Sequence, residues 1–217
     1  MKFNHSTGEI DVQIDELIVA GWTGRDTAAV AHHIRELQDI GVAPPTQTPL
    51  FYRVSRTLLT QDRDIQVLGA SSSGEAEPLL LRHDGTLWLG LASDHTDREM
   101  EAMSVVASKQ ACPKVCADTL WLFDEVAAHL DALILRSWIK DEDDWILYQD
   151  GTLSSILPLG ELADQSPFGN QMAMLCGTLA ALGGIRSAQS FRAEIHDPIL
   201  ERSIFLEYQT RNLPIIN

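Results

Sequence analysis

The sequence of 217 residues is poor in basic side chains and has no long apolar run. Its 16 lysines and arginines stand against 31 aspartates and glutamates, which gives a formal net charge of -15 at pH 7. This negative charge argues against nucleic acid and anionic membrane surfaces as partners, because both need a basic face. No run reaches the roughly 18 apolar residues of a membrane span, and no apolar signal core follows the polar N-terminus. We therefore expect a cytoplasmic protein.

Cysteine is also scarce. The three cysteines, Cys112, Cys116 and Cys176, are an odd number without regular spacing, which argues against a disulfide framework. Cys112 and Cys116 are separated by three residues, and no second pair completes a zinc site. We expect free thiols in a reducing compartment.

The remaining composition is that of a globular protein, with 45% hydrophobic and 22% charged residues. The length is sufficient to bury a substantial core. No repeat, low-complexity tract or linker divides the chain, so we expect one domain over residues 1–217. Apolar, β-branched or alternating runs predict strands at 9–20, 50–54, 65–68, 86–91, 133–139, 145–148, 172–176, 191–195 and 204–208.

Helices are predicted at fewer places. The spacing of apolar residues predicts a helix over 27–40, with Asp26 as its N-cap. A second helix is predicted over 97–108, because Met100, Met103 and Val106 recur about one turn apart, and this face is expected to pack on the sheet.

Three carboxylates bracket a predicted hairpin. Glu75 and Glu77 are two residues apart, so in an extended strand both side chains leave the same face. His83-Asp84-Gly85 predicts the turn, and the run 87–91 predicts a second strand that ends near Asp94. Like charges side by side need open water or a cation. Three carboxylates without a cysteine favour Mg²⁺, Mn²⁺ or Ca²⁺ over zinc, and the alternative is a solvated strand face.

Positive and small residues follow this cluster. Arg98 and Lys109 could meet a substrate carboxylate or a developing oxyanion, and Gly177-Thr178 could hold a further substrate oxygen. The alternatives are ordinary ion pairs for the two cations and a satisfied strand end for Thr178.

The order of these motifs resembles the catalytic domain of the fumarylacetoacetate hydrolase superfamily, and nearly the whole chain resembles an uncharacterised bacterial family related to it. The motifs that carry the resemblance are Glu75-x-Glu77, Asp94-x-x-x-Arg98, Lys109, Gln149-Asp150-Gly151-Thr152 and Gly177-Thr178. The resemblance implies an α+β, β-rich fold: a mixed β-roll or sandwich with a few peripheral helices, in a homodimer.

The resemblance also implies roles for single residues. Glu75, Glu77 and Asp94 match the residues that bind magnesium in the superfamily, and Lys109 and Arg98 match residues that bind a small anionic substrate. The implied chemistry is carbon–carbon bond hydrolysis, decarboxylation, isomerisation or hydration of oxo-acids.

The chain departs from the superfamily pattern in two places. Glu77 and Asp94 are closer in sequence than is usual, so the metal geometry depends on the short hairpin. An N-terminal element with Asn-Tyr and a histidine is replaced by residues 21–26, in which Arg25 stands about where the histidine would be. We assign Arg25 to substrate binding, and we predict that His33, oriented by Glu36, is the general base.

Three functions therefore remain open. The leading one is a Mg²⁺- or Mn²⁺-dependent hydrolase or lyase that cleaves a carbon–carbon bond in a 2-oxo or 1,3-dicarbonyl acid. The second is a decarboxylase or isomerase with the same metal, which needs no base to activate water. The third is a non-catalytic homologue that binds a small acid.

Overall fold

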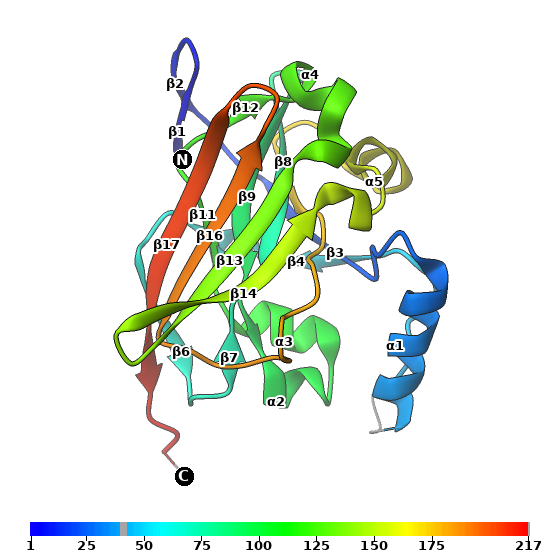
Figure 1. The fold of residues 1–217 in the computed structure, drawn as a ribbon, viewed down its shortest axis with the longest axis vertical. Coiled ribbons are helices and arrows are strands. Elements are labelled where there is room, and N and C mark those ends of the chain that lie inside the picture. The colour runs from blue at the N-terminus through cyan, green and yellow to red at the C-terminus, as the bar shows by residue number, and fades with distance from the viewer. Residues whose placement is uncertain (40–42, 217) are drawn as a thin grey trace.

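The computed structural model describes residues 1–39 and 43–216, apart from the side chains of His33, Glu36, Leu37 and Asp39. Two β-sheets face one another and form most of the molecule (Figure 1). No helix among the described residues is long and apolar enough to cross a bilayer.

The larger sheet has eight strands. Its order is β4 (Leu50–Val54), β3 (Glu16–Gly21), β15 (Met172–Leu175), β8 (Ala76–His83), β9 (Thr86–Asp94), β11 (Lys114–Cys116) and β5 (Leu59–Thr60), with β12 (Trp121–Leu122) paired to β9. The second sheet has the order β14 (Asp144–Thr152), β13 (Ile134–Asp141), β16 (Ser190–Asp197), β17 (Arg202–Leu213) and β6 (Asp64–Leu68). Two small ribbons pair β1 (Lys2–His5) with β2 (Gly8–Asp11), and β7 (Ser72–Ser73) with β10 (Thr96–Asp97).

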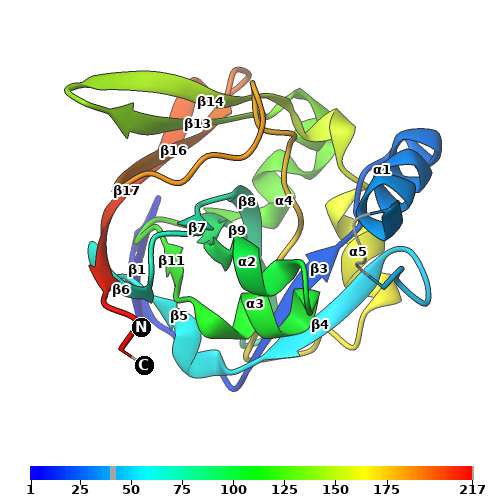
Figure 2. The same cartoon turned by 90° about the horizontal axis from the view of Figure 1, so that it is seen from below.

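The helices are short and lie outside the sheets. They are α1 (Thr27–Asp39), α2 (Arg98–Glu101), α3 (Val105–Ala111), α4 (Phe123–Val126) and α5 (Leu159–Gln165), with 3-10 turns η1 (Arg56–Leu58), η2 (Ala127–Ala132) and η3 (Leu153–Ser155). The helices α2 and α3 lie at the lower end of the molecule in Figure 1, and seen from that end they lie in front of the sheets, with α1 to one side (Figure 2). The β-rich α+β architecture expected from the sequence is confirmed.

The core has two parts, one on each face of the larger sheet. Between the sheets, Leu80 and Leu89 of the larger sheet pack in one cluster with Ile195 and Leu206 of the smaller one. The opposite face of the larger sheet forms a second cluster, which includes Phe3 of the N-terminal ribbon. Burial on both faces explains the continuous apolar runs 79–81 in β8 and 87–92 in β9, whereas β16 alternates buried and half-buried residues.

The hairpin of β8 and β9 forms as the sequence predicts. His83 pairs with Thr86, and the two turn residues Asp84 and Gly85 have φ values of 48° and 76°. Two left-handed residues in a row are those of a type I′ turn, whose twist matches that of the flanking strands. The hairpin therefore has a fixed register, which carries through to the carboxylates at its open end.

The predicted helix over 97–108 is wrong as a single element. It is two helices, α2 and α3, because Ser104 leaves the helical conformation and its hydroxyl accepts a hydrogen bond from the Ala107 amide as an N-cap. Met103 is 79% exposed and Val106 is 44% exposed, so the predicted apolar face does not pack on the sheet. The break has a consequence for the site, because it sets the direction of α3 and of Lys109.

Other boundaries also differ. The predicted strand over 9–20 is two strands, β2 and β3. β2 pairs with β1 in a separate ribbon and joins neither of the two large sheets. The N-cap of α1 is confirmed, because the Asp26 carboxylate accepts hydrogen bonds from the amides of Ala28 and Ala29 at 2.9 and 3.1 Å. The end of the predicted helix at residue 40 lies outside the described residues.

Candidate metal centre and cavity

The three predicted metal ligands meet at the open end of the β8–β9 hairpin. Glu75 precedes β8, Glu77 lies in β8 and Asp94 ends β9. The Asp94 amide donates a hydrogen bond of 3.0 Å to the Glu75 carbonyl, and one carboxylate oxygen from each of the three residues lies within 4.8 Å of the others. The short hairpin thus brings Asp94 to the two glutamates, as the metal hypothesis requires.

Asp94 is fully buried between two lysines. Lys109 of α3 forms an ion pair with its Oδ2 atom, and Lys114 of β11 forms one with Oδ1 at 2.8 Å. Burial raises the pKa of Asp94, but the charges of Lys109 and Lys114 outweigh burial and hold this pKa below its usual range. Asp94 is therefore ionised at neutral pH.

Lys109 keeps its charge for the same reason. Burial lowers the pKa of its ammonium group, but Asp94, Glu75 and Glu77 outweigh burial and raise this pKa above its usual value. A lysine that stays protonated cannot accept a proton as a general base. Lys109 can instead supply a fixed positive charge to an anionic ligand.

Glu77 is the carboxylate with the least compensation. It is buried, and among the described residues it makes no ion pair. Its Oε2 atom accepts a hydrogen bond of 2.7 Å from the Gly177 amide. Burial, and then the charge of Asp94, raise the pKa of Glu77 well above its usual value. A cation at this point would stabilise the ionised form.

Gly177 is at this position for a steric reason. Its φ of 98° lies in the left-handed region, and a Cβ atom built on it would overlap the Thr23 hydroxyl oxygen. Only glycine permits this approach, which lets the Gly177 amide reach Glu77.

Arg98 forms an ion pair with Glu75, the third carboxylate of the cluster. Its guanidinium lies 3.1 Å from Glu75 and 2.8 Å from Glu101, and its Nε atom donates to the Ser73 hydroxyl at 2.8 Å. Burial lowers the pKa of Arg98, but Glu75 and Glu101 outweigh burial and raise it. Arg98 thus holds Glu75 and Glu101 in place from α2.

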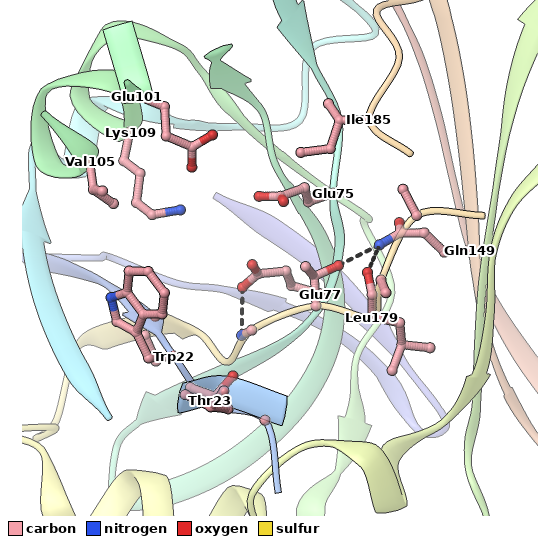
Figure 3. A pocket seen from close by; sticks show the side chains of 18 of the residues that line it. Trp22, Thr23, Glu75, Glu77, Glu101, Val105, Lys109, Gln149, Leu179 and Ile185 are labelled. Carbon is pink, nitrogen blue, oxygen red and sulfur yellow. Dashed lines mark hydrogen bonds between the residues drawn. The ribbon is translucent and has the colours of Figure 1, made fainter. Parts of the chain in front are cut away.

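A buried amide joins the two sheets beside the cluster. Gln149 of β14 accepts a hydrogen bond of 3.0 Å from the Ala76 amide and donates to the Thr178 hydroxyl and the Leu179 carbonyl, each at 2.6 Å (Figure 3). Thr178 donates its own proton to the Ala76 carbonyl at 2.8 Å. Thr178 can therefore offer a ligand only a lone pair unless this bond breaks.

A second polar network supports Asp94 from behind. His95 lies between the Tyr208 hydroxyl and the Ser72 hydroxyl, at 2.8 Å from each, and Tyr208 also contacts the Ser93 hydroxyl at 2.8 Å. Burial, followed by the charges of Lys114 and Arg98, lowers the pKa of His95 to about 3. His95 is therefore neutral at physiological pH, and from its place just after β9 it links β17 to β7.

Glu75 and Glu77 of the carboxylate cluster line a cavity of about 430 Å³, whereas Asp94 is buried beside them. Polar side chains in its lining include Glu75, Glu77, Glu101, Lys109, Gln149 and Thr178. Apolar or aromatic side chains include Trp22, Tyr52, Val105, Tyr148, Leu179 and Ile185. In Figure 3 the Lys109 ammonium extends toward Glu75 and Glu77, and Trp22 lies beside it. The cavity thus combines a charged end with an apolar wall, the usual character of a small-molecule site.

The structure places the other predicted residues as follows. Arg25 forms a pair with Asp131 through two hydrogen bonds of 2.7 Å, and it is not among the described residues that line the cavity. The side chains of His33 and Glu36 lie outside the described residues. Their roles, and those of the other candidate residues, stay predictions.

Several residues of the site were missed in the sequence. Lys114 is the register partner of Asp94 on β11, and its only sequence signal is a lysine inside the run Cys-Pro-Lys-Val-Cys. Glu101 and Tyr52 reach the cavity through tertiary packing that no local pattern indicates.

A family profile described as "Protein of unknown function (DUF2848)" matches residues 20–208. No curated protein matches the sequence. Among solved structures, a proposed fumarylpyruvate hydrolase from Burkholderia cenocepacia is 14% identical, with a TM-score of 0.62 over 98% of this chain and 95% of its own.

Two further structures are similar at comparable levels. A 2-keto-3-deoxyarabinonate dehydratase is 12% identical, with a TM-score of 0.63 over 94% of this chain and 75% of its own. A 2-hydroxyhepta-2,4-diene-1,7-dioate isomerase from Mycobacterium marinum is 12% identical, with a TM-score of 0.62 over 93% of this chain and 76% of its own. Identity this low carries the fold and not the activity. The chain therefore belongs to the DUF2848 family and has the fold of the fumarylacetoacetate hydrolase superfamily.

Proposed function

We propose that the protein is a divalent-metal-dependent hydrolase or lyase that cleaves a carbon–carbon bond in a small 2-oxo or 1,3-dicarbonyl acid. The observation that carries this proposal is the cluster of Glu75, Glu77 and Asp94, in which the two glutamates line the cavity and Asp94 is buried beside them. Its oxygen atoms lie close enough together to bind one ion, and hard oxygen ligands suit Mg²⁺ or Mn²⁺.

The electrostatics of the cluster fit a cation. Asp94 and Glu75 already have basic partners, whereas Glu77 is buried without an ion pair among the described residues. An ion held by the three carboxylates would supply Lewis-acid chemistry, which polarises an oxo group and stabilises an enolate. Because Lys109 occupies one oxygen of Asp94, its ammonium group must give way or share that oxygen when an ion binds.

Lys109 has a clear task in such a reaction. Its ammonium group lines the cavity and stays charged, so it attracts the substrate carboxylate or an oxyanion that develops during bond cleavage. Before an ion binds, the buried Asp94 holds this charge beside the two glutamates. Arg98 acts through Glu75 and Glu101, which it orients.

The hydrolase reaction also needs a base to activate water. We assign this task to His33, oriented by Glu36, on α1. Two described residues of α1, Ala29 and Val30, line the cavity, and His33 follows Ala29 by about one helical turn. Hydrolysis of an acylpyruvate would add water across the bond between the acyl carbonyl carbon and the CH₂ group of the pyruvate unit. The products would be pyruvate and a carboxylic acid.

Two alternatives keep the same cavity. A decarboxylase or isomerase would use the same metal and Lys109 without a base that activates water. A non-catalytic acid-binding homologue is favoured by the tight pairing of Asp94 with Lys109 and Lys114, because an ion must compete with both ammonium groups.

The test is turnover of a panel of acylpyruvates and other 2-oxo acids with Mg²⁺, Mn²⁺ or EDTA. The hydrolase releases pyruvate and a carboxylic acid, a decarboxylase releases CO₂, and an isomerase releases neither. We expect EDTA and Glu77→Gln each to abolish turnover, and His33→Ala to abolish hydrolysis only. Absence of any product with bound metal would favour the binding homologue.

A further inference from the structure

The cavity has one wall that no catalytic role explains. Trp22 and Tyr52 lie on it, joined by a hydrogen bond of 3.1 Å from the indole nitrogen to the phenol oxygen. Leu179, Val105 and Ile185 add apolar side chains elsewhere in the lining of the cavity (Figure 3). Neither metal binding nor proton transfer requires such a surface, so it is available to the part of a ligand that does not react.

The aromatic pair is held rigidly. Trp22 has a φ of 61°, a left-handed conformation that a residue with a bulky side chain adopts only when its surroundings enforce it. The Tyr52 ring lies against Gly21, where an added Cβ atom would be 2.8 Å from the ring. A rigid aromatic surface binds a flat apolar group at little cost in conformational entropy.

The charges of the cavity limit what the far end of a ligand can carry. Among the described residues that line the cavity, Lys109 is the one cationic side chain, and its charge is already directed at Asp94 and the two glutamates. Glu101 adds a further carboxylate to the lining. A second carboxylate beside Glu101 or the aromatic pair would therefore meet an apolar or acidic wall, which disfavours it.

Resting on the proposed function, we propose that the cavity takes a 2-oxo acid with a single carboxylate and an apolar substituent of about the size of a ring. The acid end lies at the carboxylate cluster and Lys109, and the substituent lies against Trp22 and Tyr52. A volume of about 430 Å³ is enough for an acid of this size. Trp22 is then a residue that determines specificity.

Three stable ligands test this assignment in the Mn²⁺-loaded protein. Oxamate mimics the oxo-acid end alone, N-phenyloxamate adds a ring, and N-(4-carboxyphenyl)oxamate adds a second carboxylate to that ring. Calorimetry gives the dissociation constant of each. We expect N-phenyloxamate to bind at least about tenfold more tightly than oxamate, because burying a ring removes apolar surface from water. The second carboxylate should cancel this gain.

Variants locate the ring. Trp22→Gly removes the indole at a position whose φ suits glycine, so the backbone is not strained by the change. We expect it to reduce the preference for N-phenyloxamate over oxamate about tenfold. Trp145→Ala is the matched control, because Trp145 stacks on Arg192 with 4.2 Å from the guanidinium carbon to the ring centre, outside the cavity lining. It should leave the preference unchanged.

Ile185→Lys should instead favour the ligand with the second carboxylate. Ile185 lines the cavity and is 56% exposed, so a lysine fits there without disturbing the core. We expect it to raise the affinity for N-(4-carboxyphenyl)oxamate about tenfold, because it supplies the missing cation. Binding of N-(4-carboxyphenyl)oxamate as tightly as N-phenyloxamate by the unaltered protein would overturn the inference.

Binding of oxamate distinguishes failure of the inference about the apolar wall from failure of the proposed function. If oxamate binds only with Mn²⁺ and the ring adds no affinity, the metal site stands and the inference about the apolar wall is wrong. If oxamate does not bind with Mn²⁺, the proposed function fails, and the inference fails with it.

Discussion

Asp94 and Lys114 face one another as register partners on β9 and β11, with 2.8 Å between Oδ1 and the ammonium nitrogen. Both side chains are fully buried. Lys114 also donates a hydrogen bond of 2.6 Å to the His95 carbonyl. The lysine therefore fixes the carboxylate from the side away from the cavity, while Lys109 reaches the other oxygen from the cavity side.

Replacing Lys114 by methionine tests this support. Loss of one partner from a buried ion pair costs about 3–5 kcal/mol, and we expect about 3 kcal/mol because Lys109 still pairs with Asp94. Urea denaturation measures the loss. Lys140→Met, at the exposed end of β13, is the control and should change stability by less than about 0.5 kcal/mol. A loss below about 1 kcal/mol for Lys114→Met would contradict the assigned role.

Replacing Glu77 by glutamine should leave the metal-free protein as stable but weaken its stabilisation by metal. Because the pKa of Glu77 is raised in the folded state, this residue lowers the stability of the protein as the pH rises above the unfolded pKa of about 4.5. At pH 7 the metal-free variant should therefore melt no lower than the unaltered protein. Millimolar Mn²⁺ should raise the melting temperature of the unaltered protein and have a much smaller effect on Glu77→Gln.

Glu9→Gln is the control for this experiment, because Glu9 is an exposed acid on β2 that pairs with Lys2. It should keep the full response to Mn²⁺. Equal responses of the Glu77 and Glu9 variants would show that the ion binds elsewhere.

His95 should make stability depend on pH. Its pKa falls from about 6.5 in the unfolded chain to about 3 in the folded protein, so the unfolded state binds more protons between these values. The contribution of His95 is complete above pH 6.5 and declines as the pH falls toward 3, by up to about 1.4 kcal/mol per pH unit. Urea denaturation from pH 7 to pH 4 measures this slope.

His95→Gln isolates the contribution, since Glu77 and Asp94 titrate in the same protein. The variant should lose the part of the slope that His95 supplies, so the difference between the two proteins shrinks as the pH falls. A constant difference from pH 7 to pH 4 would mean that His95 does not titrate as expected.

Gly177 and Gly183 form a matched pair for testing the close approach to Thr23. Both are left-handed, with φ of 98° and 76°, but an added Cβ meets the Thr23 hydroxyl at Gly177 and nothing within 4 Å at Gly183. Alanine at either position costs about 1–2 kcal/mol for the backbone. Gly177→Ala should cost at least about 2 kcal/mol more, and equal losses in urea denaturation would contradict the steric account.

Much of the site could be predicted because its signals are local. The turn residues Asp84 and Gly85 fix the register of the β8–β9 hairpin, and this register alone brings Asp94 to the glutamates. The Asp26 cap of α1 is local in the same way. The order of motifs along the chain then indicates the superfamily fold.

What could not be predicted depends on packing between distant segments. Lys114 pairs with Asp94 because β11 lies beside β9, and the sequence gives no sign of that neighbour. The predicted helix over 97–108 failed because the capping hydroxyl of Ser104 outweighs the periodicity of Met103 and Val106. The wall of Trp22 and Tyr52 likewise needs β3 and β4 to be paired.

The central claim is that Glu75, Glu77 and Asp94 hold a divalent cation. Anomalous diffraction from a crystal soaked in Mn²⁺ tests it most directly, because the signal locates the ion. We predict one strong peak about 2.2 Å from an oxygen of each carboxylate, with the Lys109 ammonium moved from its present pairing with Asp94. A crystal without a peak at these residues, with Lys109 still paired to Asp94, would contradict the account.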